Sequence, residues 1–196
     1  HADHVFAAKE LSEIANAQLY FSAREDYKIK HTKVDDGEFI SVGKKQLKVV
    51  HTPGHTAGSM TYVLDNICAF CGDTLFTESI GRPDLRDQAE EFADELYETL
   101  HNKLLNLPQN TKIFPTHHGE GVKPIENGVY FTTPKMAKNL PLLDLPKKEF
   151  VSKVVSMTTP RPMNYSTIIK VNRGDIPLIE NEIPDLEMGP NRCSIE

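Results

Sequence analysis

The sequence predicts an α/β protein, and three observations point to that fold class. Apolar residues near the amino end repeat with helical spacing and are followed by a short β-rich run. Four more β-rich runs come close together, divided by turn residues, which is typical of hairpins in a mixed sheet. A long amphipathic segment after them predicts a helix. We therefore expect one mixed sheet accompanied by helices.

Turn residues and changes of periodicity set the bounds of the first elements. A helix is expected over about residues 5–17, and a strand over residues 18–22. Turns at Gly43-Lys44, Pro53-Gly54 and Asp65-Asn66 separate the next four strands. We expect these strands at residues 38–42, 46–52, 59–64 and 67–71.

The most regular pattern of the chain lies between about residues 87 and 107. One face carries only apolar residues, namely Phe92, Leu96, Leu100, Leu104 and Leu105. The opposite face is mostly acidic, with Glu90, Glu91, Asp94, Glu95 and Glu98. This division predicts a long amphipathic helix. Residues 111–116 then predict a short buried strand that ends in a polar loop.

Beyond about residue 139, prolines interrupt most of the sequence. Only a helix near residues 147–157 and a strand near residues 166–171 are expected there. We interpret residues 1–139 as a catalytic domain and residues 140–196 as an extension that packs on it. The residues from about 183 onward are expected to be disordered or to dock on a neighbouring subunit of a homo-oligomer.

Composition favours small-molecule partners over nucleic acid or membranes. The chain has 196 residues, 39% of them hydrophobic, and a formal net charge of -6. An acidic chain offers no electrostatic attraction to phosphate backbones or anionic lipids. No apolar stretch reaches the roughly 20 residues that span a bilayer, and the first residues do not form a secretory signal. We therefore expect a cytoplasmic protein.

The three cysteines do not form a disulfide framework, because their number is odd and small. Cys68 and Cys71 make a CxxC pair that suggests a redox or zinc site, but they lie in an expected strand. Residues three apart on a strand point to opposite faces, so we interpret both as small buried hydrophobes.

Histidines and aspartates stand at four places along the chain where strands are expected to end or loops to begin. They are His1-Ala2-Asp3-His4, His55, Asp73 and His117. Imidazoles and carboxylates together suit zinc or non-haem iron, whereas magnesium and calcium prefer oxygen ligands. Taken singly, each residue is more often structural than a ligand. Taken together, they predict a transition-metal centre.

The spacing of these residues resembles the metallo-β-lactamase superfamily. Its signature is His-x-His-x-Asp-His, followed by a His in a Gly-His-Thr turn, an Asp after a strand and a final His. The resemblance covers residues 1–121 and implies an αββα sandwich. The chain begins at the second His of the signature. The resemblance therefore implies that part of the amino-terminal half is lacking, with another His two residues before His1, and that a sheet edge and an apolar face are exposed.

The resemblance also implies a role for each residue. His1 and His55 correspond to ligands of the first metal site, and Asp73 bridges two sites or serves one. Asp3, His4 and His117 correspond to second-site ligands. In mononuclear members His1 is instead an outer residue. The candidate catalytic residues are Asp3, as a proton acceptor for metal-bound water, and His1. The remaining histidines, His31, His51, His101 and His118, are expected to be structural or exposed.

The segment Gly81-Arg82-Pro83-Asp84-Leu85 resembles persulfide dioxygenases more than glyoxalase II. The stretch from Pro162 to Gly174, with Asn172-Arg173-Gly174, resembles the segment after the catalytic domain in dioxygenases fused to rhodanese domains. Arg82 is the candidate for binding an acidic substrate or for holding the metal loop, with a plain salt bridge to Asp84 as the alternative.

The resemblance implies oxidation of a low-molecular-weight persulfide, such as glutathione persulfide, to sulfite with O2 and Fe(II). Two histidines and one carboxylate leave positions on Fe(II) for a sulfur donor and O2. The first alternative is a glyoxalase II-like hydrolase with zinc or mixed metals, mononuclear or dinuclear, acting on a thioester. The second alternative is a non-catalytic metal-binding fragment.

Overall fold

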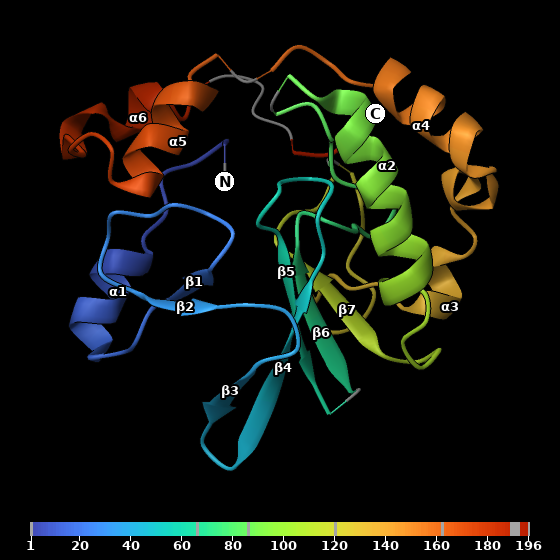
Figure 1. Ribbon diagram of the computed structural model, residues 1–196, viewed down its shortest axis with the longest axis horizontal. Coiled ribbons are helices and arrows are strands. Elements are labelled where there is room, and N and C mark those ends of the chain that lie inside the picture. Colours follow the sequence, from blue (N-terminus) through green and yellow to red (C-terminus); the bar gives the residue numbers. More distant parts are fainter. Residues whose placement is uncertain are drawn as a thin grey trace. The chain divides into compact units, whose positions relative to one another are not determined.

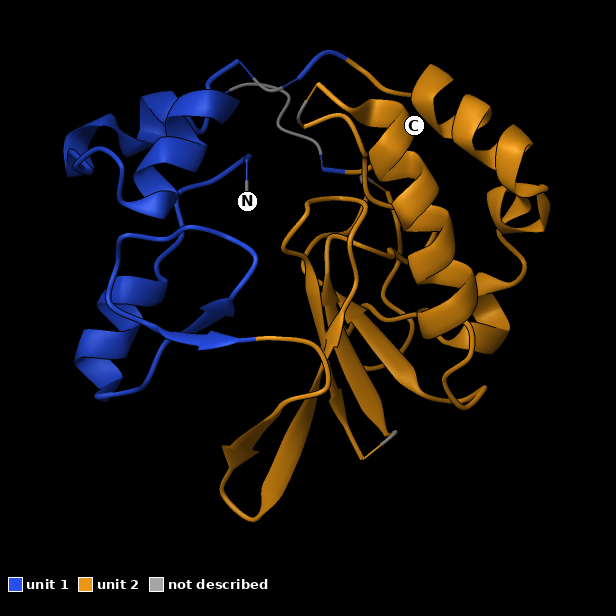
Figure 2. Ribbon diagram, in the orientation of Figure 1, with its two compact units in different colours: residues 1–34, 160–193 blue, residues 35–159, 194–196 orange. Residues whose placement is uncertain are grey.

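The structure is a computed structural model that describes residues 2–65, 67–85, 87–119, 121–161, 163–188 and 193–195. The chain forms two compact units, coloured separately in Figure 2. The first unit comprises residues 1–34 and 160–193, and the second comprises residues 35–159 and 194–196. Within the described residues, no helix is long and apolar enough to cross a membrane.

The second unit is built on a five-stranded sheet in the order β3-β4-β5-β6-β7 (Figure 1). The strands are β3 (Phe39–Val42), β4 (Lys45–His51), β5 (Met60–Leu64), β6 (Cys68–Gly72) and β7 (Lys112–Pro115). Neighbours are antiparallel from β3 to β6, while β6 and β7 are parallel. The mixed sheet predicted from the four β-rich runs is therefore confirmed.

Helices cover one face of this sheet. They are α2 (Ala89–Thr99), its π-helical continuation η1 (Leu100–Leu104), α3 (Pro134–Ala137), the 3-10 helix η2 (Pro141–Asp144) and α4 (Lys147–Ser156). Strand residues such as Ala69 and Ile113 form one buried cluster with Leu96 of α2 and Phe150 of α4. On the opposite face of β6, Phe70 is 45% exposed and its ring stacks on Phe114 of β7. The core of the unit therefore lies between the sheet and its helices.

The first unit brings the two ends of the chain together. It contains α1 (Ala8–Ala15), β1 (Tyr20–Ser22), β2 (Thr32–Val34), α5 (Tyr165–Arg173), the 3-10 helix η3 (Glu180–Glu182) and α6 (Ile183–Leu186). Strands β1 and β2 form a short parallel pair. Side chains of α5 bond to the backbone of residues 4, 6 and 26. The first unit thus depends on the carboxy-terminal extension.

The two compact units do not meet at the predicted domain boundary after residue 139, because each unit is formed by more than one stretch of the chain. Leu143, Phe150 and Val154 belong to the core of the second unit, so residues 140–159 pack on its sheet. Residues 160–193 group instead with residues 1–34. The domain boundary itself stays a prediction.

One predicted strand is wrong. Residues 166–171 lie in the helix α5, and a strand was favoured there by the β-branched sequence Thr167-Ile168-Ile169. Ile168, Val171 and Asn172 are the buried residues of α5 and follow a helical spacing, so tertiary packing overrides local propensity. The other predicted helices and strands are confirmed within a few residues, and the short strand β2 was not predicted.

Of the two alternatives for the end of the chain, disorder is wrong for the residues described there, whereas docking on a neighbouring subunit stays a prediction. Ile183–Leu186 form a helix, and the side chain of Ile195 is 3% exposed in the core of the second unit. The backbone N–H of Ile195 donates to the carbonyl of Ile80, and Ser194 forms a bridge with Gly81. An apolar side chain close to the terminus is thus held by the chain's own core.

Cys68 and Cys71 lie on one strand, as predicted, but only Cys71 is the buried residue that was expected. Cys71 is buried, Cys68 on the same strand is half-buried, and none of the three cysteines is in a disulfide. Burial raises the pKa of Cys71 to about 12, although the backbone carbonyl of Leu75 accepts a hydrogen bond from it. Cys71 therefore behaves as a small core residue.

Candidate metal centre

Three of the predicted ligands in the second unit follow the carboxyl ends of strands. His55 comes after β4, Asp73 directly after β6 and His117 after β7. Strand β5 is antiparallel to both β4 and β6, so β4 and β6 run in the same direction, and β7 is parallel to β6. All three side chains therefore start from the same edge of the sheet.

Asp73 lies between the two imidazoles. Its Oδ2 is 3.7 Å from Nε2 of His55, and its Oδ1 is 2.7 Å from Nδ1 of His117. The side chains of Asp73 and His55 are 1% and 5% exposed, whereas that of His117 is 33% exposed. The two oxygens of one buried carboxylate thus face different histidines.

A backbone carbonyl fixes the orientation of His55. Nδ1 of His55 is 2.9 Å from the carbonyl oxygen of Arg82. A carbonyl only accepts, so Nδ1 carries the proton and the lone pair of the neutral ring is on Nε2. Nε2 is the atom that faces Asp73. This is the tautomer that a metal ligand needs, with its second nitrogen held by an outer partner.

Two glycines allow the backbone to approach closely around His55 and Asp73. A Cβ at Gly81 would lie 1.9 Å from the carbonyl oxygen of Asp73, so only glycine fits there. Gly54 has φ 131, and a Cβ there would lie 2.5 Å from Cα of Leu96 in α2. Gly54 therefore serves the contact of the His55 loop with a helix, and Gly81 serves the contact of the Arg82 loop with Asp73.

Arg82 is buried, and its guanidinium is engaged within its own loop. Its Nε and Nη2 donate to the two carboxylate oxygens of Asp84 at 2.7 and 2.8 Å, and the residue is 1% exposed. Nη2 also donates to the carbonyl of Thr159. The structure thus shows the salt bridge that the sequence analysis gave as an alternative. The predicted substrate-binding role of Arg82 stays a prediction.

Asp3 and His4 lie in the first unit, in the segment before α1. Nδ1 of His4 is 3.0 Å from Oδ1 of Asp3. The backbone of residues 4–6 is held by two side chains. Asn172 donates to the carbonyl of His4 and accepts from the N–H of Phe6, and Glu187 accepts from the N–H of Val5. His1, the remaining predicted ligand, lies outside the described residues. The ligand and catalytic roles of these three residues stay predictions.

The donor atoms of the second unit fit a transition metal. Two atoms that bind one ion at about 2.0 to 2.2 Å are separated by at most about 4.4 Å. The 3.7 Å between His55 Nε2 and Asp73 Oδ2 satisfies this condition. Two imidazoles and a carboxylate are also the donor types of zinc and non-haem iron sites. The residues present therefore fit a metal of this class.

The other histidines have structural contacts, as expected. His51 and His101 bond to the carbonyls of Ala57 and Leu143, and His31 lies 2.6 Å from the carbonyl of Ile29. His118 stacks on Tyr130 with ring centroids 3.8 Å apart.

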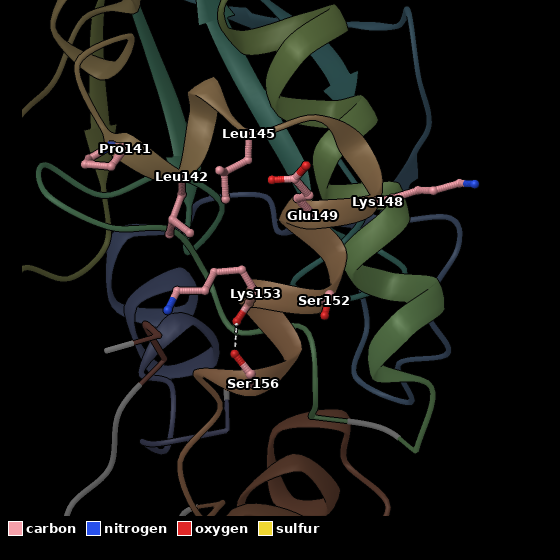
Figure 3. Close-up of a pocket in the computed structure, with 8 residues that line it drawn as sticks. All are labelled: Pro141, Leu142, Leu145, Lys148, Glu149, Ser152, Lys153 and Ser156. Carbon is pink, nitrogen blue, oxygen red and sulfur yellow. Dashed lines mark hydrogen bonds between the residues drawn. The ribbon is translucent and has the colours of Figure 1, made fainter.

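A groove of about 600 Å³ lies along α4 and η2, and Figure 3 shows the side chains that line it. They are Pro141, Leu142, Leu145, Lys148, Glu149, Ser152, Lys153 and Ser156. This set contains none of the predicted ligands, and Ser156 donates its hydroxyl proton to the carbonyl of Lys153 on the same helix. The groove is therefore separate from the candidate metal centre.

Comparison with known families identifies the class of protein. Residues 1–117 match the family described as the Metallo-beta-lactamase superfamily. This match covers more than half of the chain, which therefore belongs to that superfamily and has its fold. The family and the fold predicted from the sequence are thus confirmed, and the family is one of metal-binding proteins.

Individual relatives carry two kinds of name. A protein of Bos taurus named persulfide dioxygenase ETHE1, mitochondrial, is 30% identical over 175 residues, which are 88% of this chain and 65% of that protein. The crystal structure of ETHE1 from Myxococcus xanthus superposes with a TM-score of 0.78 at 28% identity, covering 89% of this chain and 73% of that one. A hydroxyacylglutathione hydrolase of Pseudomonas aeruginosa is 32% identical over 119 residues, which are 60% of this chain and 44% of the enzyme.

The chain spans 65% of the length of the bovine relative. The activity, substrates and compartment of the relatives therefore do not transfer directly. The cytoplasmic location, the small-molecule partners, the absence of nucleic-acid and membrane partners and the homo-oligomer stay predictions for this chain.

Sequence reasoning missed the groups that hold the ligands. His55 is held by the backbone carbonyl of Arg82, and the backbone at Gly81 passes too close to Asp73 for a side chain. Contacts of backbone atoms cannot be predicted from the types of residues in a sequence. Asn172 was noticed only as part of a resemblance, since its partners are backbone groups more than 160 residues away in sequence.

Proposed function

We propose that this chain supplies most of the metal centre of a persulfide dioxygenase. The reaction is the oxidation of the outer sulfur of a low-molecular-weight persulfide, such as glutathione persulfide, to sulfite. The main support for this proposal is the share of the chain that each kind of relative matches. The relative named persulfide dioxygenase matches 88% of the chain, whereas the hydroxyacylglutathione hydrolase matches 60%. The dioxygenase match is long enough to include much of the extension beyond residue 139. The hydrolase match, at 119 residues, is shorter than the predicted domain of residues 1–139 alone.

His55 and Asp73 are the proposed ligands of Fe(II). An Fe(II) ion held by histidines and one carboxylate offers positions for a sulfur donor and for O2 together. The chain's own contribution is to hold a buried negative charge at Asp73 and the correct imidazole tautomer at His55. Zinc is the alternative metal, because general affinity does not select iron over zinc.

The reaction balances without a further oxidant. The outer sulfur of the persulfide takes both atoms of O2 and one oxygen of water and leaves as sulfite with two protons. The carrier is released as its thiol. O2 is the species reduced, and the outer sulfur is the species oxidised.

Arg82 is proposed to hold the loop of the metal centre. Its guanidinium is bound to Asp84 and Thr159, and its carbonyl accepts from His55. These contacts favour the loop-holding alternative over direct substrate binding, because a substrate anion would have to displace Asp84.

A glyoxalase II-like thioester hydrolase is the second candidate. One observation favours it: the second oxygen of Asp73 lies 2.7 Å from Nδ1 of His117, so one carboxylate contacts the histidines that the resemblance assigns to two different ions. A second ion in this reading would use Asp3, His4 and His117, and the metals would activate water toward a thioester carbonyl.

The deciding experiment compares the two reactions on the same sample. The chain is loaded anaerobically with Fe(II), and O2 uptake with glutathione persulfide is followed with an oxygen electrode while sulfite is measured. We expect coupled O2 uptake and sulfite formation, and negligible hydrolysis of S-lactoylglutathione. Fast thioester cleavage with two metals per chain and no O2 uptake would support the hydrolase. Metal binding without either reaction would support the non-catalytic reading.

A further inference from the structure

The tripeptide Asn172-Arg173-Gly174 ends helix α5 and contacts the amino-terminal part of the first unit. Each of its residues has a partner there. Nε of Arg173 donates to the carbonyl of Asp26 at 3.1 Å, and its own carbonyl accepts from the N–H of Lys28 at 2.8 Å. Gly174 has φ 78, and a Cβ there would lie 3.1 Å from Ile29. The tripeptide thus holds the loop at residues 26–29.

Asn172 holds a different segment, the one that carries two predicted metal ligands. Its Nδ2 donates to the carbonyl of His4 at 2.9 Å, and its Oδ1 accepts from the N–H of Phe6 at 3.0 Å. Asn172 is 4% exposed. A carboxamide both donates and accepts, so it satisfies two backbone groups that a carboxylate or an apolar side chain of the same size could not satisfy together.

A third contact completes the clamp. Oε1 of Glu187 accepts from the N–H of Val5 at 2.7 Å, so residues 4, 5 and 6 are each fixed through a backbone atom. This segment lies outside helices and strands, and α1 begins at Ala8. Chain segments without such regular structure lose order unless their backbone is tied down. The direction of the Asp3 and His4 side chains therefore depends on these side-chain contacts.

We propose that Asn172 is a positioning residue for the metal-ligand pair Asp3 and His4. It acts through the backbone of residues 4 and 6 and touches neither substrate nor metal. The inference rests on the resemblance that makes Asp3 and His4 ligands of a second ion, so it concerns a dinuclear centre, whichever reaction that centre catalyses. It gives the extension a function, because a helix of the carboxy-terminal part sets the geometry of ligands at the opposite end of the chain.

The test is metal affinity, measured on the metal-free chain with Co(II), whose visible absorption also reports the ligand geometry. Asn172→Leu removes both hydrogen bonds at similar volume. We expect the affinity to fall by about 10- to 100-fold, as for other outer partners of metal ligands, together with a change in the Co(II) spectrum. Asn172→Asp keeps the acceptor and loses the donor, so its effect is expected to be intermediate. If Asn172→Leu does not fold, the Co(II) affinity of Asn172→Asp tests the proposal instead.

Asn164 provides a matched control at the other end of the same helix. Its Nδ2 donates to the carbonyls of Asp185 and Leu186. Asn164→Leu therefore removes carboxamide bonds inside the first unit without touching residues 4–6. We expect its Co(II) affinity to stay within about threefold of the parent, even if its melting temperature falls.

A double-mutant cycle with His4 separates positioning from general stability. If Asn172 positions the pair Asp3 and His4, then Asn172→Leu has a smaller further effect on Co(II) affinity once His4→Ala is present, because only Asp3 is then left to position. Additive losses, equal losses for the Asn164 and Asn172 variants, or an unchanged affinity in Asn172→Leu would each overturn the proposal. A chain that binds no Co(II) would overturn it together with the metal centre. Failure of persulfide oxidation alone would leave these measurements intact and would count only against the proposed reaction.

Discussion

In the second unit the predicted ligands follow strands of a sheet with a buried core, whereas in the first unit Asp3 and His4 precede a helix in an irregular segment. The strand ends aim His55 and Asp73 through backbone hydrogen bonds and packing. The irregular segment is instead held by hydrogen bonds from side chains of the extension, chiefly that of Asn172. The predicted ligands of the two units are thus held by two different kinds of support.

The two units also bury different amounts of apolar side chain. The core cluster of the second unit extends from the strands through α2 to α4 and includes Ile195. Among the described residues of the first unit, the hydrophobic side chains classed as buried are Ala2, Val34, Ile168, Val171 and Cys193. Apolar burial dominates folding stability, so we expect the first unit to rely more on polar contacts and to open more easily.

The largest effect is expected from Asp73→Asn. The substitution removes the one carboxylate that faces both His55 and His117 while keeping the shape of the side chain. Loss of an outer partner alone costs about 10- to 100-fold in metal affinity, so loss of this ligand is expected to cost more than about 100-fold. Metal content after dialysis, measured by elemental analysis, checks the result.

Asp65→Asn is the control for that measurement. Asp65 is a partly exposed residue in the turn after β5, paired with Lys45. It also has φ 48, which asparagine tolerates. Retention of metal by Asp73→Asn at the level of Asp65→Asn would remove Asp73 from the centre.

The next effect concerns the core of the second unit. Phe150 of α4 is fully buried and packs edge-on against Tyr97 of α2 with ring centroids 5.3 Å apart. Phe150→Ala is expected to lower the free energy of unfolding by about 3 to 5 kcal/mol. Denaturant unfolding followed by circular dichroism measures it. Phe39→Ala, at a site 58% exposed on β3, serves as the control and is expected to change little. Similar losses in both variants would show that α4 is not part of the core.

The sequence predicted most of the second unit because its elements are local patterns. Turn residues divide β3 to β6, and the apolar stripe from Phe92 to Leu104 marks α2 and η1. The π-helical geometry of η1 was not predictable, because its buried residues Leu100 and Leu104 are four apart, a spacing that an α-helix has as well. Helix α5 was missed because the β-branched residues Thr167, Ile168 and Ile169 favour a strand locally, whereas the helix is stabilised by burial of Ile168, Val171 and Asn172 against distant parts of the chain.

The candidate site was predictable to a similar degree. Side chains at strand ends are visible as residue types, so His55, Asp73 and His117 were found, and the structure brings them together. The outer partners were found less well. Arg82 was noticed, but its carbonyl rather than its charge contacts His55. Backbone acceptors are the same in every residue, which is why a sequence does not reveal them.

A smaller effect is expected in the chemistry of β6. At pH 8, a pKa of about 12 leaves only about one Cys71 thiol in ten thousand ionised, and the side chain is 1% exposed. Cys68 is half-buried on the same strand. We expect iodoacetamide to alkylate Cys68 at least about 100-fold faster than Cys71 in the folded chain. Peptide mass spectrometry over time measures both rates. Equal rates would show that β6 opens readily and that the second unit is less stable than its core implies.

The smallest effect belongs to the polar contacts of the first unit. Nζ of Lys28 lies 2.9 Å from Oδ1 of Asp175, and this hydrogen bond lowers the pKa of Asp175. A carboxyl group with a lowered pKa in the folded state stabilises the fold fully above its unfolded pKa of about 3.9, and the contribution is lost as pH falls through the lower folded pKa. Asp175→Asn is therefore expected to lower the melting temperature slightly near pH 7, with the difference from the parent disappearing toward pH 3 and below. Lys28→Met is expected to cause a smaller loss, because Asp175 keeps the contact of its Oδ2 with Nε of Arg173 at 3.5 Å. Adding Lys28→Met to Asp175→Asn is expected to cause little further loss, because Lys28 has then already lost this partner. Calorimetry between pH 2.5 and 7 measures these melting temperatures. A difference between Asp175→Asn and the parent that grows on acidification would show that the fold disfavours the ionised form of Asp175. The ion pair with Lys28 would then not stabilise the first unit.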